Sequence, residues 1–301
     1  MNPSIIYWKW DDSHLDGRYL DEIEDICKRS CFSHIYVTTH WCNYGTASAT
    51  MHDIIAKAVE KVHGLGRKFI FEIDARAEKK YFLERFPERL GFLYTREIKL
   101  DESGKASYLL NIVQEEQCEL FFASNHYSAE VVDARSYFKE KDLIDENSVT
   151  AASAICKRIN NKQVEVCVSA EKGANRYAYV AVCSYVNFPD FSSRNFYKFF
   201  TDLIERYSDI PLDGVTLDEF SLPVHPDFNF TNRTYNDWDR CRLYGVSMSK
   251  AYEKKYNSKF FDDVFDSYYL PPDNKKRISA INRYFEFIRS MVTEYETMVY
   301  D

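Results

Sequence analysis

Hydrophobic and polar positions in the first ninety residues repeat one unit: an apolar run, a polar loop and an amphipathic helical pattern. Residues 5–10 form an apolar and aromatic run, and apolar positions over 19–27 then recur at three- and four-residue spacing. The unit returns with residues 34–40 followed by a helical pattern over 54–62, and again with residues 67–74. Strands that alternate with helices in this way predict βαβ units in a parallel sheet.

The period changes to two between about Tyr94 and Asn187. Residues 96–100 and 106–112 flank the turn 101–104 and predict a hairpin. Farther on, apolar and other residues alternate from 163 to 168, with Val164, Val166 and Val168 on one face. About seven short strands over roughly ninety residues are typical of a small β-sandwich. We therefore expect an antiparallel domain inserted into a β/α scaffold.

The helix-and-strand pattern resumes after the predicted insertion. An aromatic helical pattern over 196–207 leads into the apolar segment 212–220, which predicts a fourth scaffold strand. Further helices follow residue 238. The last has apolar residues at alternating spacings of three and four, which predicts one long, strongly amphipathic helix. The residues of its apolar face are Ile278, Ile281, Phe285, Ile288, Val292, Tyr295 and Val299.

The order of elements favours a barrel over a nucleotide-binding sheet, because no glycine-rich phosphate loop follows the first strand. We predict an α/β fold with a (β/α) TIM-barrel-type scaffold and an inserted antiparallel β-sandwich. Its parts are residues 1–93, 94–190 and 191–301. A closed barrel needs eight parallel strands and the pattern supplies four. Either the sheet is open, or the barrel is incomplete and the natural protein continues beyond Asp301.

Charge and composition narrow the class of partner. Lys and Arg number 39 against 47 Asp and Glu, so the net charge of −8 disfavours binding to nucleic acid or anionic lipid. No apolar run is long enough for a membrane span, and no secretory signal is visible. The eight cysteines form no Cys-x-x-Cys pair and are interpreted as reduced thiols in a cytoplasmic protein. An exported protein whose signal had been removed would look the same.

Polar and aromatic side chains gather where the predicted parallel strands end, the edge at which such sheets carry their functional groups. Carboxylates end three of the four strands. Paired carboxylates beside aromatic rings are what cleavage of a glycosidic bond requires. In chain order the strand ends are Trp8, Trp10, Asp11 and Asp12; Thr38, Thr39, His40 and Trp41; Glu72, Asp74 and Arg76; and Asp218, Glu219 and Phe220.

Glu219 is the candidate proton donor, because burial at the end of a central strand raises the pKa of a carboxyl group. Asp218 points to the other side of an extended strand, so Asp74 or Asp11 is the expected partner. The substrate-binding candidates are Trp8, Trp10, Asp11, His40, Trp41, Arg76 and Phe220, of which the aromatic residues would stack on a sugar. The structural alternative is that Asp218 and Glu219 cap the next loop or helix.

Three segments resemble a known group of enzymes. Asp213-Gly-Val-Thr-Leu-Asp-Glu-Phe220, Trp8-Lys-Trp10-Asp11 and Tyr244-Gly245 ahead of the last helices are similar to TIM-barrel glycoside hydrolases, particularly large bacterial α-L-rhamnosidase and β-galactosidase-like families. The resemblance implies a glycoside or oligosaccharide substrate and places Glu219 at the acid/base position. The chain departs from the common Asn-Glu pair by having Asp218. The second catalytic carboxylate of such enzymes comes from a later strand, which is not visible here.

The leading interpretation is a glycoside hydrolase with no cofactor and no metal, no nucleic-acid or membrane partner, and a homo-oligomeric state left open. A non-catalytic carbohydrate-binding or interaction protein on the same scaffold is the first alternative. The second is a metal-dependent hydrolase with oxygen ligands from Asp11, Asp74, Asp218 and Glu219. The sugar, its anomer and the stereochemical course stay open.

Overall fold

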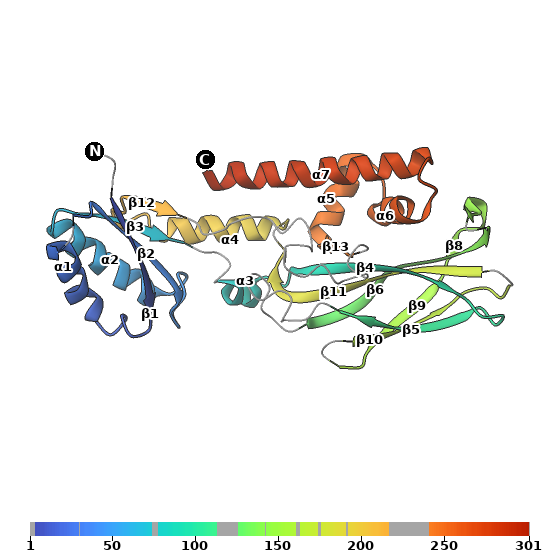
Figure 1. Ribbon diagram of the computed structural model, residues 1–301, viewed down its shortest axis with the longest axis horizontal. Helices are drawn as coiled ribbons and strands as arrows, with labels where there is room; N and C mark the ends of the chain where they lie inside the picture. Colours follow the sequence, from blue (N-terminus) through green and yellow to red (C-terminus); the bar gives the residue numbers. More distant parts are fainter. Residues whose placement is uncertain are drawn as a thin grey trace. The chain divides into compact units, whose positions relative to one another are not determined.

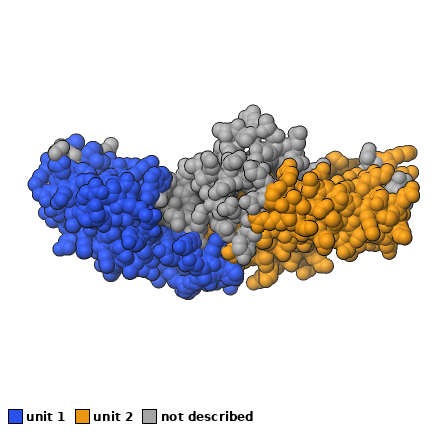
Figure 2. All heavy atoms as spheres, turned by 90° about the horizontal axis from the view of Figure 1, so that it is seen from below, with its two compact units in different colours: residues 1–87, 194–221 blue, residues 88–193, 222–301 orange. Residues whose placement is uncertain are grey.

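The computed structural model describes residues 4–29, 31–73, 78–112, 126–141, 143–160, 163–173, 176–190, 192–216 and 241–300. The chain forms two compact units, coloured blue and orange in Figure 2. Unit 1 contains residues 1–87 and 194–221, and unit 2 contains residues 88–193 and 222–301. Residues 191–301, which the sequence pattern joins into one part, are thus divided between the two units.

Unit 1 is built on a four-stranded parallel sheet in the order β1-β2-β3-β12. The predicted βαβ units are confirmed for the first three strands, because each pairs in parallel with the next along the chain. The strands are β1 (Ile5–Asp11), β2 (His34–Trp41), β3 (Lys68–Glu72) and β12 (Gly214–Thr216). The helices are α1 (Arg18–Arg29), α2 (Ala49–Gly64), α3 (Lys79–Arg85) and α4 (Arg194–Glu205).

The two faces of this sheet differ in what they carry. Right-handed crossovers between consecutive strands place the helices on the same face, and Figure 1 shows α1 and α2 together on one side. On that face Trp10, Val37 and Phe71 are at most 1% exposed. Since side chains alternate along a strand, the residues between them, among them Tyr36 and Glu72, point to the other face. That second face carries a row of polar groups.

Helix α2 begins one residue after a cap that the sequence pattern did not identify. The Ser48 hydroxyl accepts a hydrogen bond from the Met51 amide at 3.1 Å. Thr50 and Asp53, which have the spacing of a capping box, already lie inside the helix. The predicted apolar face is confirmed, and its buried residues are Met51, Ile54, Ile55, Ala58, Val59 and Val62.

The predicted TIM-barrel-type scaffold is wrong. Among the residues that the structure describes, the parallel strands number four and form one open sheet, while the remaining strands pair antiparallel in two further sheets. A closed barrel would need eight parallel strands. The chain instead leaves the parallel sheet after β3. The first described strand after β12, which is β13 (Cys241–Tyr244), pairs antiparallel with β4 of unit 2.

In the residues that the structure describes, unit 2 contains two antiparallel sheets and three helices. The larger sheet has the order β13-β4-β11-β6-β7, with β8 paired to β6, and the smaller has the order β5-β10-β9. The strands are β4 (Arg89–Lys99), β5 (Lys105–Asn111), β6 (His126–Glu140), β7 (Leu143–Ile144), β8 (Thr150–Ala151), β9 (Ser153–Arg158), β10 (Gln163–Ser169) and β11 (Arg176–Pro189). A 3₁₀ turn spans Glu146–Ser148, and the helices are α5 (Val246–Tyr256), α6 (Phe260–Tyr269) and α7 (Lys275–Tyr300).

The predicted hairpin over residues 96–112 is wrong, although its turn is present. The Gly104 amide donates to the Asp101 carbonyl at 2.9 Å, but β4 then pairs with β11 while β5 pairs with β10. The two strands therefore enter different sheets, and the larger of these is a curled half-barrel rather than one layer of the predicted β-sandwich. Local alternation predicted both strands, but their partners lie more than fifty residues away.

Helices α5, α6 and α7 cover the larger sheet of unit 2 (Figure 1). Tyr179, Ala181 and Cys183 of β11 are buried in one cluster with Phe265 of α6 and Phe287 of α7. In the smaller sheet, the face of β10 predicted to be apolar is confirmed as buried, with Val164, Val166 and Val168 at most 3% exposed. None of the described helices has both the length and the apolar character needed to cross a membrane.

Gly245, the residue before α5, lies against a buried carboxylate. Asp190 is 2% exposed, and a methyl group at Gly245 would overlap its carboxyl group. We expect Gly245→Ala to lower the free energy of unfolding by about 1–3 kcal/mol, the usual cost of overpacking. Gly173→Ala is the matched control, because a methyl group there meets only the Phe138 ring at 3.4 Å, an ordinary contact. Urea denaturation of both variants checks this, and equal midpoints would contradict it.

Candidate functional site

A row of polar side chains crosses the second face of the parallel sheet. Strand pairing aligns Lys9 with Thr38, and Glu72 with Thr216. The middle of the row is closed by a hydrogen bond at 2.7 Å from the Thr38 hydroxyl to Glu72 Oε1. One residue from each of the four strands therefore contributes to a single line across the sheet, near the carboxyl ends of the strands.

Glu72 is the centre of this row. It is 1% exposed, and the Tyr36 hydroxyl donates to its Oε2 while Thr38 donates to Oε1. The Thr216 hydroxyl donates in turn to the Tyr36 oxygen at 2.8 Å. A buried carboxylate is costly without such donors. The chain of hydroxyl groups thus stabilises and orients Glu72 at a fixed point on the sheet.

Tyr36 stays a neutral donor over the physiological range. Burial raises the pKa of its phenol well above the ordinary value, and the hydrogen bond to Glu72 raises it further. The Tyr36 ring also packs against Tyr7 of β1, with ring centroids 4.7 Å apart. The hydrogen bond to Glu72 and the ring packing against Tyr7 together hold the Tyr36 hydroxyl beside the Glu72 carboxylate.

An exposed aromatic surface lies at the β1 end of the polar row. Trp41 is 63% exposed and Tyr7 is 46% exposed. The Lys9 ammonium lies 5.5 Å from the Trp41 ring centroid and 5.6 Å from that of Tyr7, which is the geometry of a cation–π contact. Large apolar side chains grouped at a surface are typical of binding sites. A ligand with apolar faces and hydroxyl groups would find both rings and hydrogen-bonding groups here.

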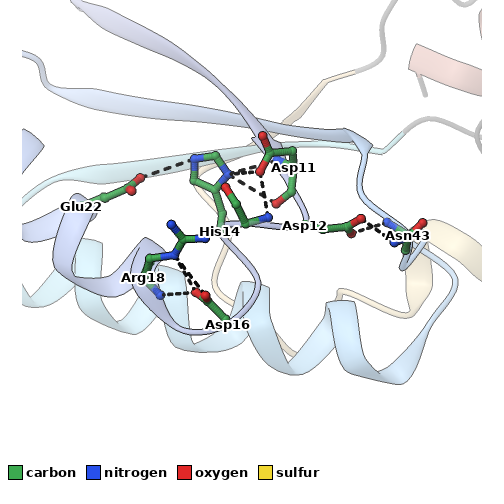
Figure 3. A network of polar contacts seen from close by, with 8 residues as sticks. Asp11, Asp12, His14, Asp16, Arg18, Glu22 and Asn43 are labelled. Atoms are coloured by element: carbon green, nitrogen blue, oxygen red, sulfur yellow. Dashed lines mark hydrogen bonds and ion pairs between the residues drawn. The ribbon is translucent and has the colours of Figure 1, made fainter.

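The loop after β1 is organised by its own carboxylates (Figure 3). Asp11 Oδ1 lies 3.0 Å from His14 Nδ1, and hydrogen bonds from Ser13 are the main cause that lowers the pKa of Asp11. Asp12 accepts hydrogen bonds from the Asn43 amide at 2.6 Å and from its side chain. These contacts join the loops after β1 and β2. The structure therefore shows Asp11 engaged within its own loop.

The tryptophans of β1 point to the helix side of the sheet. Trp10 is 1% exposed, its ring centroid lies 5.1 Å from that of Tyr19, and its ring stacks on His14. Trp8 packs edge to face on Trp10 at 5.4 Å. The three tryptophans that were predicted to stack on a sugar all lie in the described part of the chain. Trp10 is in the core, whereas Trp41 is exposed beside the polar row.

The remaining predicted site residues lie outside the described part of the chain. They are Asp74, Arg76, Asp218, Glu219 and Phe220, and the side chain of His40 joins them. Two of them follow residues of the polar row closely in the sequence. Asp74 comes two residues after Glu72, and Asp218 comes two residues after Thr216.

The sequence pattern assigned no role to Tyr7, Lys9, Tyr36 or Thr216, and it noted Glu72 only as a strand end. One signal was available for Glu72, because it is an acidic residue that interrupts the otherwise apolar segment 69–73 of a central strand. A carboxylate at such a position must find donors. Alternation along β2 places Tyr36 and Thr38 on one face of that strand. Whether this is also the face of Glu72 depends on the register between β2 and β3.

A second buried carboxylate joins the loops after β2 and β3. Glu78 is fully buried, and the Thr46 hydroxyl donates to it at 2.8 Å. Gly45 lies so close that a methyl group there would overlap the Glu78 carboxyl group. The Tyr207 hydroxyl donates to the Thr46 carbonyl at 2.6 Å and so holds the same loop from the segment after α4. In the part of the chain that the structure describes, no three His, Cys, Asp or Glu residues gather as a metal site.

Comparison with known proteins finds no family model that matches the chain. No curated protein and no solved structure matches it either. The resemblance to glycoside hydrolases noted from short sequence segments therefore stays a prediction, and a proposal of function rests on the geometry of the site.

Proposed function

We propose that this protein is a glycoside hydrolase whose site lies on the Glu72 face of the parallel sheet. The observation that carries the proposal is the buried Glu72 carboxylate, held by Tyr36 and Thr38 beside the exposed rings of Tyr7 and Trp41. Cleavage of a glycosidic bond uses two carboxyl groups near the bond. Glu72 supplies one. Glu219, three residues after the register partner of Glu72, supplies the other.

The two carboxyl groups take different roles in the proposed mechanism. Glu219 protonates the glycosidic oxygen as the leaving group departs. Glu72, oriented by its hydroxyl donors, attacks the anomeric carbon or activates a water molecule. Tyr36 holds the attacking oxygen in place, and Trp41 stacks on the sugar ring. No cofactor takes part. Six cysteines in the described part of the chain form no disulfide, which supports a cytoplasmic enzyme.

Glu219→Gln tests the assignment of the proton donor. The wild-type protein is assayed with a panel of 4-nitrophenyl glycosides and with alkyl glycosides, whose leaving groups are poorer. We expect turnover of at least one sugar, and a decrease of kcat by about 10²- to 10⁴-fold in Glu219→Gln for the alkyl glycoside. Asp218→Asn is the matched neighbour and should retain kcat within a few fold. Equal rates in wild type and Glu219→Gln would refute the role.

A non-catalytic carbohydrate-binding protein is the second candidate, favoured by the exposure of Trp41 and Tyr7. The same panel separates the two functions, because a binding protein would retain a glycan and release no product. Loss of activity on exhaustive chelation would instead favour the metal-dependent hydrolase.

Trp41→Ala tests the aromatic surface separately from the chemistry. Because Trp41 is 63% exposed, its removal should change the free energy of unfolding by no more than about 0.5 kcal/mol. Lost stacking should raise KM by about tenfold with little change in kcat, the pattern of uniform binding. Ile155→Ala in unit 2, 67% exposed, is the matched control and should leave KM unchanged. A fall in kcat at constant KM would contradict a purely binding role for Trp41.

A further inference from the structure

Helix α7 has two apolar stripes, and unit 2 buries only one of them. Ala280, Tyr284 and Phe287 are at most 8% exposed, and Met291 packs against the same cluster. Of the residues that the spacing predicted as the apolar face, Ile278 is 47% exposed and Phe285 is 65% exposed. The buried set and this predicted set fall on neighbouring sides of the helix, because successive residues turn by about 100°.

The exposed stripe has the spacing of a coiled-coil seam. Ile278, Ile281, Phe285, Ile288 and Val292 recur at alternating intervals of three and four, which are the a and d positions of a heptad. Ile281 and Val292 are half-buried, and Ile288 lies at the border with the buried cluster. In Figure 1, α7 continues past α5 toward its carboxyl end. A ridge of this kind on a long helix suits pairing with another helix.

The distribution of charge along α7 favours a second copy of the same helix in antiparallel orientation. Its first three residues are Lys275, Lys276 and Arg277, whereas the charged residues of its last two turns are Glu294 and Glu296. Lys276 pairs with Glu146, but no acidic partner is described for Lys275 or Arg277. A second α7 in antiparallel orientation would place the basic end of each helix beside the acidic end of the other. A parallel arrangement would place like charges together, which is unfavourable.

We propose that two copies of this chain associate through the α7 stripe as an antiparallel, two-fold symmetric pair. The register that fills every layer with apolar residues sets Phe285 opposite Ile288 of the second copy, and Ile281 opposite Val292. The same register brings the basic turn 275–277 of one helix beside the acidic turn 294–296 of the other. A two-fold axis between the helices makes each contact occur twice. This pairing is independent of the proposed glycosidase activity.

Sedimentation velocity of the full chain over about 1–100 µM tests the pairing. We expect a dimer for the wild type. In Phe285→Glu the dissociation constant should rise by at least about 30-fold, the loss typical of a central interface residue. Thr293→Glu places the same charge on an exposed position of α7 outside the stripe and should still dimerise. A monomeric wild type, or a Phe285→Glu variant that dimerises as well as the wild type, would overturn the proposal.

Disulfide formation tests the orientation. Ile281→Cys and Val292→Cys variants are mixed and oxidised, and mass spectrometry identifies the joined peptides, which separates the new disulfide from those of native cysteines. The antiparallel register predicts a bond between residues 281 and 292 of different copies. Bonds that join 281 to 281 and 292 to 292 in each variant alone would show a parallel pair and overturn this arrangement. Circular dichroism of each variant confirms that α7 still folds.

Discussion

Glu72→Gln is expected to lower kcat on the best glycoside by about 10²- to 10⁴-fold, the usual contribution of a positioned catalytic carboxyl group. Gln has nearly the same shape and can still accept the Thr38 hydrogen bond, so the sheet should keep its register. What the variant loses is the negative charge that attacks the anomeric carbon or activates water, together with the oxygen that accepts the Tyr36 hydrogen bond. The change should therefore appear in kcat, with KM changed by no more than a few fold.

Glu97→Gln is the control for this experiment. Glu97 lies in unit 2, where it accepts hydrogen bonds from the Tyr137 hydroxyl at 2.5 Å and from Lys139 at 2.7 Å. It is thus a second carboxylate with a tyrosine donor, but it belongs to the other unit and takes no part in the proposed chemistry. Glu97→Gln should retain kcat within about twofold, and a comparable loss in both variants would show that the effect of Glu72→Gln is structural.

Arg283→Met is expected to have the largest effect on stability. Asp263 of α6 is 5% exposed and accepts two hydrogen bonds from Arg283, from Nε at 2.7 Å and from Nη2 at 2.5 Å. The Tyr252 hydroxyl donates to the same carboxylate at 2.5 Å. Removal of Arg283 leaves a buried charge without its cation, which typically costs about 3–5 kcal/mol. We expect α6 and α7 to separate from the larger sheet more readily.

The effect of Arg283→Met should depend on pH. Burial raises the pKa of Asp263, but hydrogen bonds from Arg283 and Tyr252 and the charge of Arg283 lower it below its ordinary value. A carboxyl group with a depressed pKa adds stability above its unfolded pKa of about 4, and the wild type loses this contribution as pH falls through the folded value. In the variant, burial without the Arg283 cation raises the pKa of Asp263, so this carboxyl group is protonated earlier and the difference from wild type should already shrink as the pH falls from 7 to 4.

Urea denaturation at pH 7 and pH 4 measures this, with hydrogen exchange of the α6 and α7 peptides to localise the change. Lys276→Met is the matched control on the same helix. Its pair with Glu146 is 65% and 37% exposed, so its loss should cost no more than about 1 kcal/mol. Equal destabilisation by the two substitutions, or a loss at pH 4 as large as at pH 7, would contradict the role of the buried pair.

Local periodicity predicted the elements of unit 1 well, because each strand is followed by the helix that covers it. The parallel pairing of β1, β2 and β3 follows from this order. The barrel was wrong for a different reason. Closure of a sheet depends on which strands pair, and β13 pairs with β4 across about 150 residues of chain. No local pattern carries that information.

The candidate site overlaps the sequence prediction only in part. Carboxylates and aromatic rings at strand ends pointed to the edge of the sheet at which the Glu72 row lies, and Trp41 lies there exposed. The prediction for Trp10 is wrong, because alternation along a strand decides whether a ring faces the helices or the Glu72 face, and Trp10 faces the helices. The network of Tyr36, Thr38 and Thr216 around Glu72 depends on register across three strands, which becomes visible only when the strands are paired.

Hydrogen exchange with and without bound sugar tests whether the sugar-binding site lies on the Glu72 face of the parallel sheet. The experiment locates the site on the chain without assuming a reaction. The ligand is the oligosaccharide that the wild-type protein retains best on a glycan array. We expect bound sugar to slow amide exchange in peptides that cover residues 7–11, 34–41 and 68–73. Trp41→Ala should lose this protection. Protection confined to unit 2, with no change in β1, β2 or β3, would contradict it.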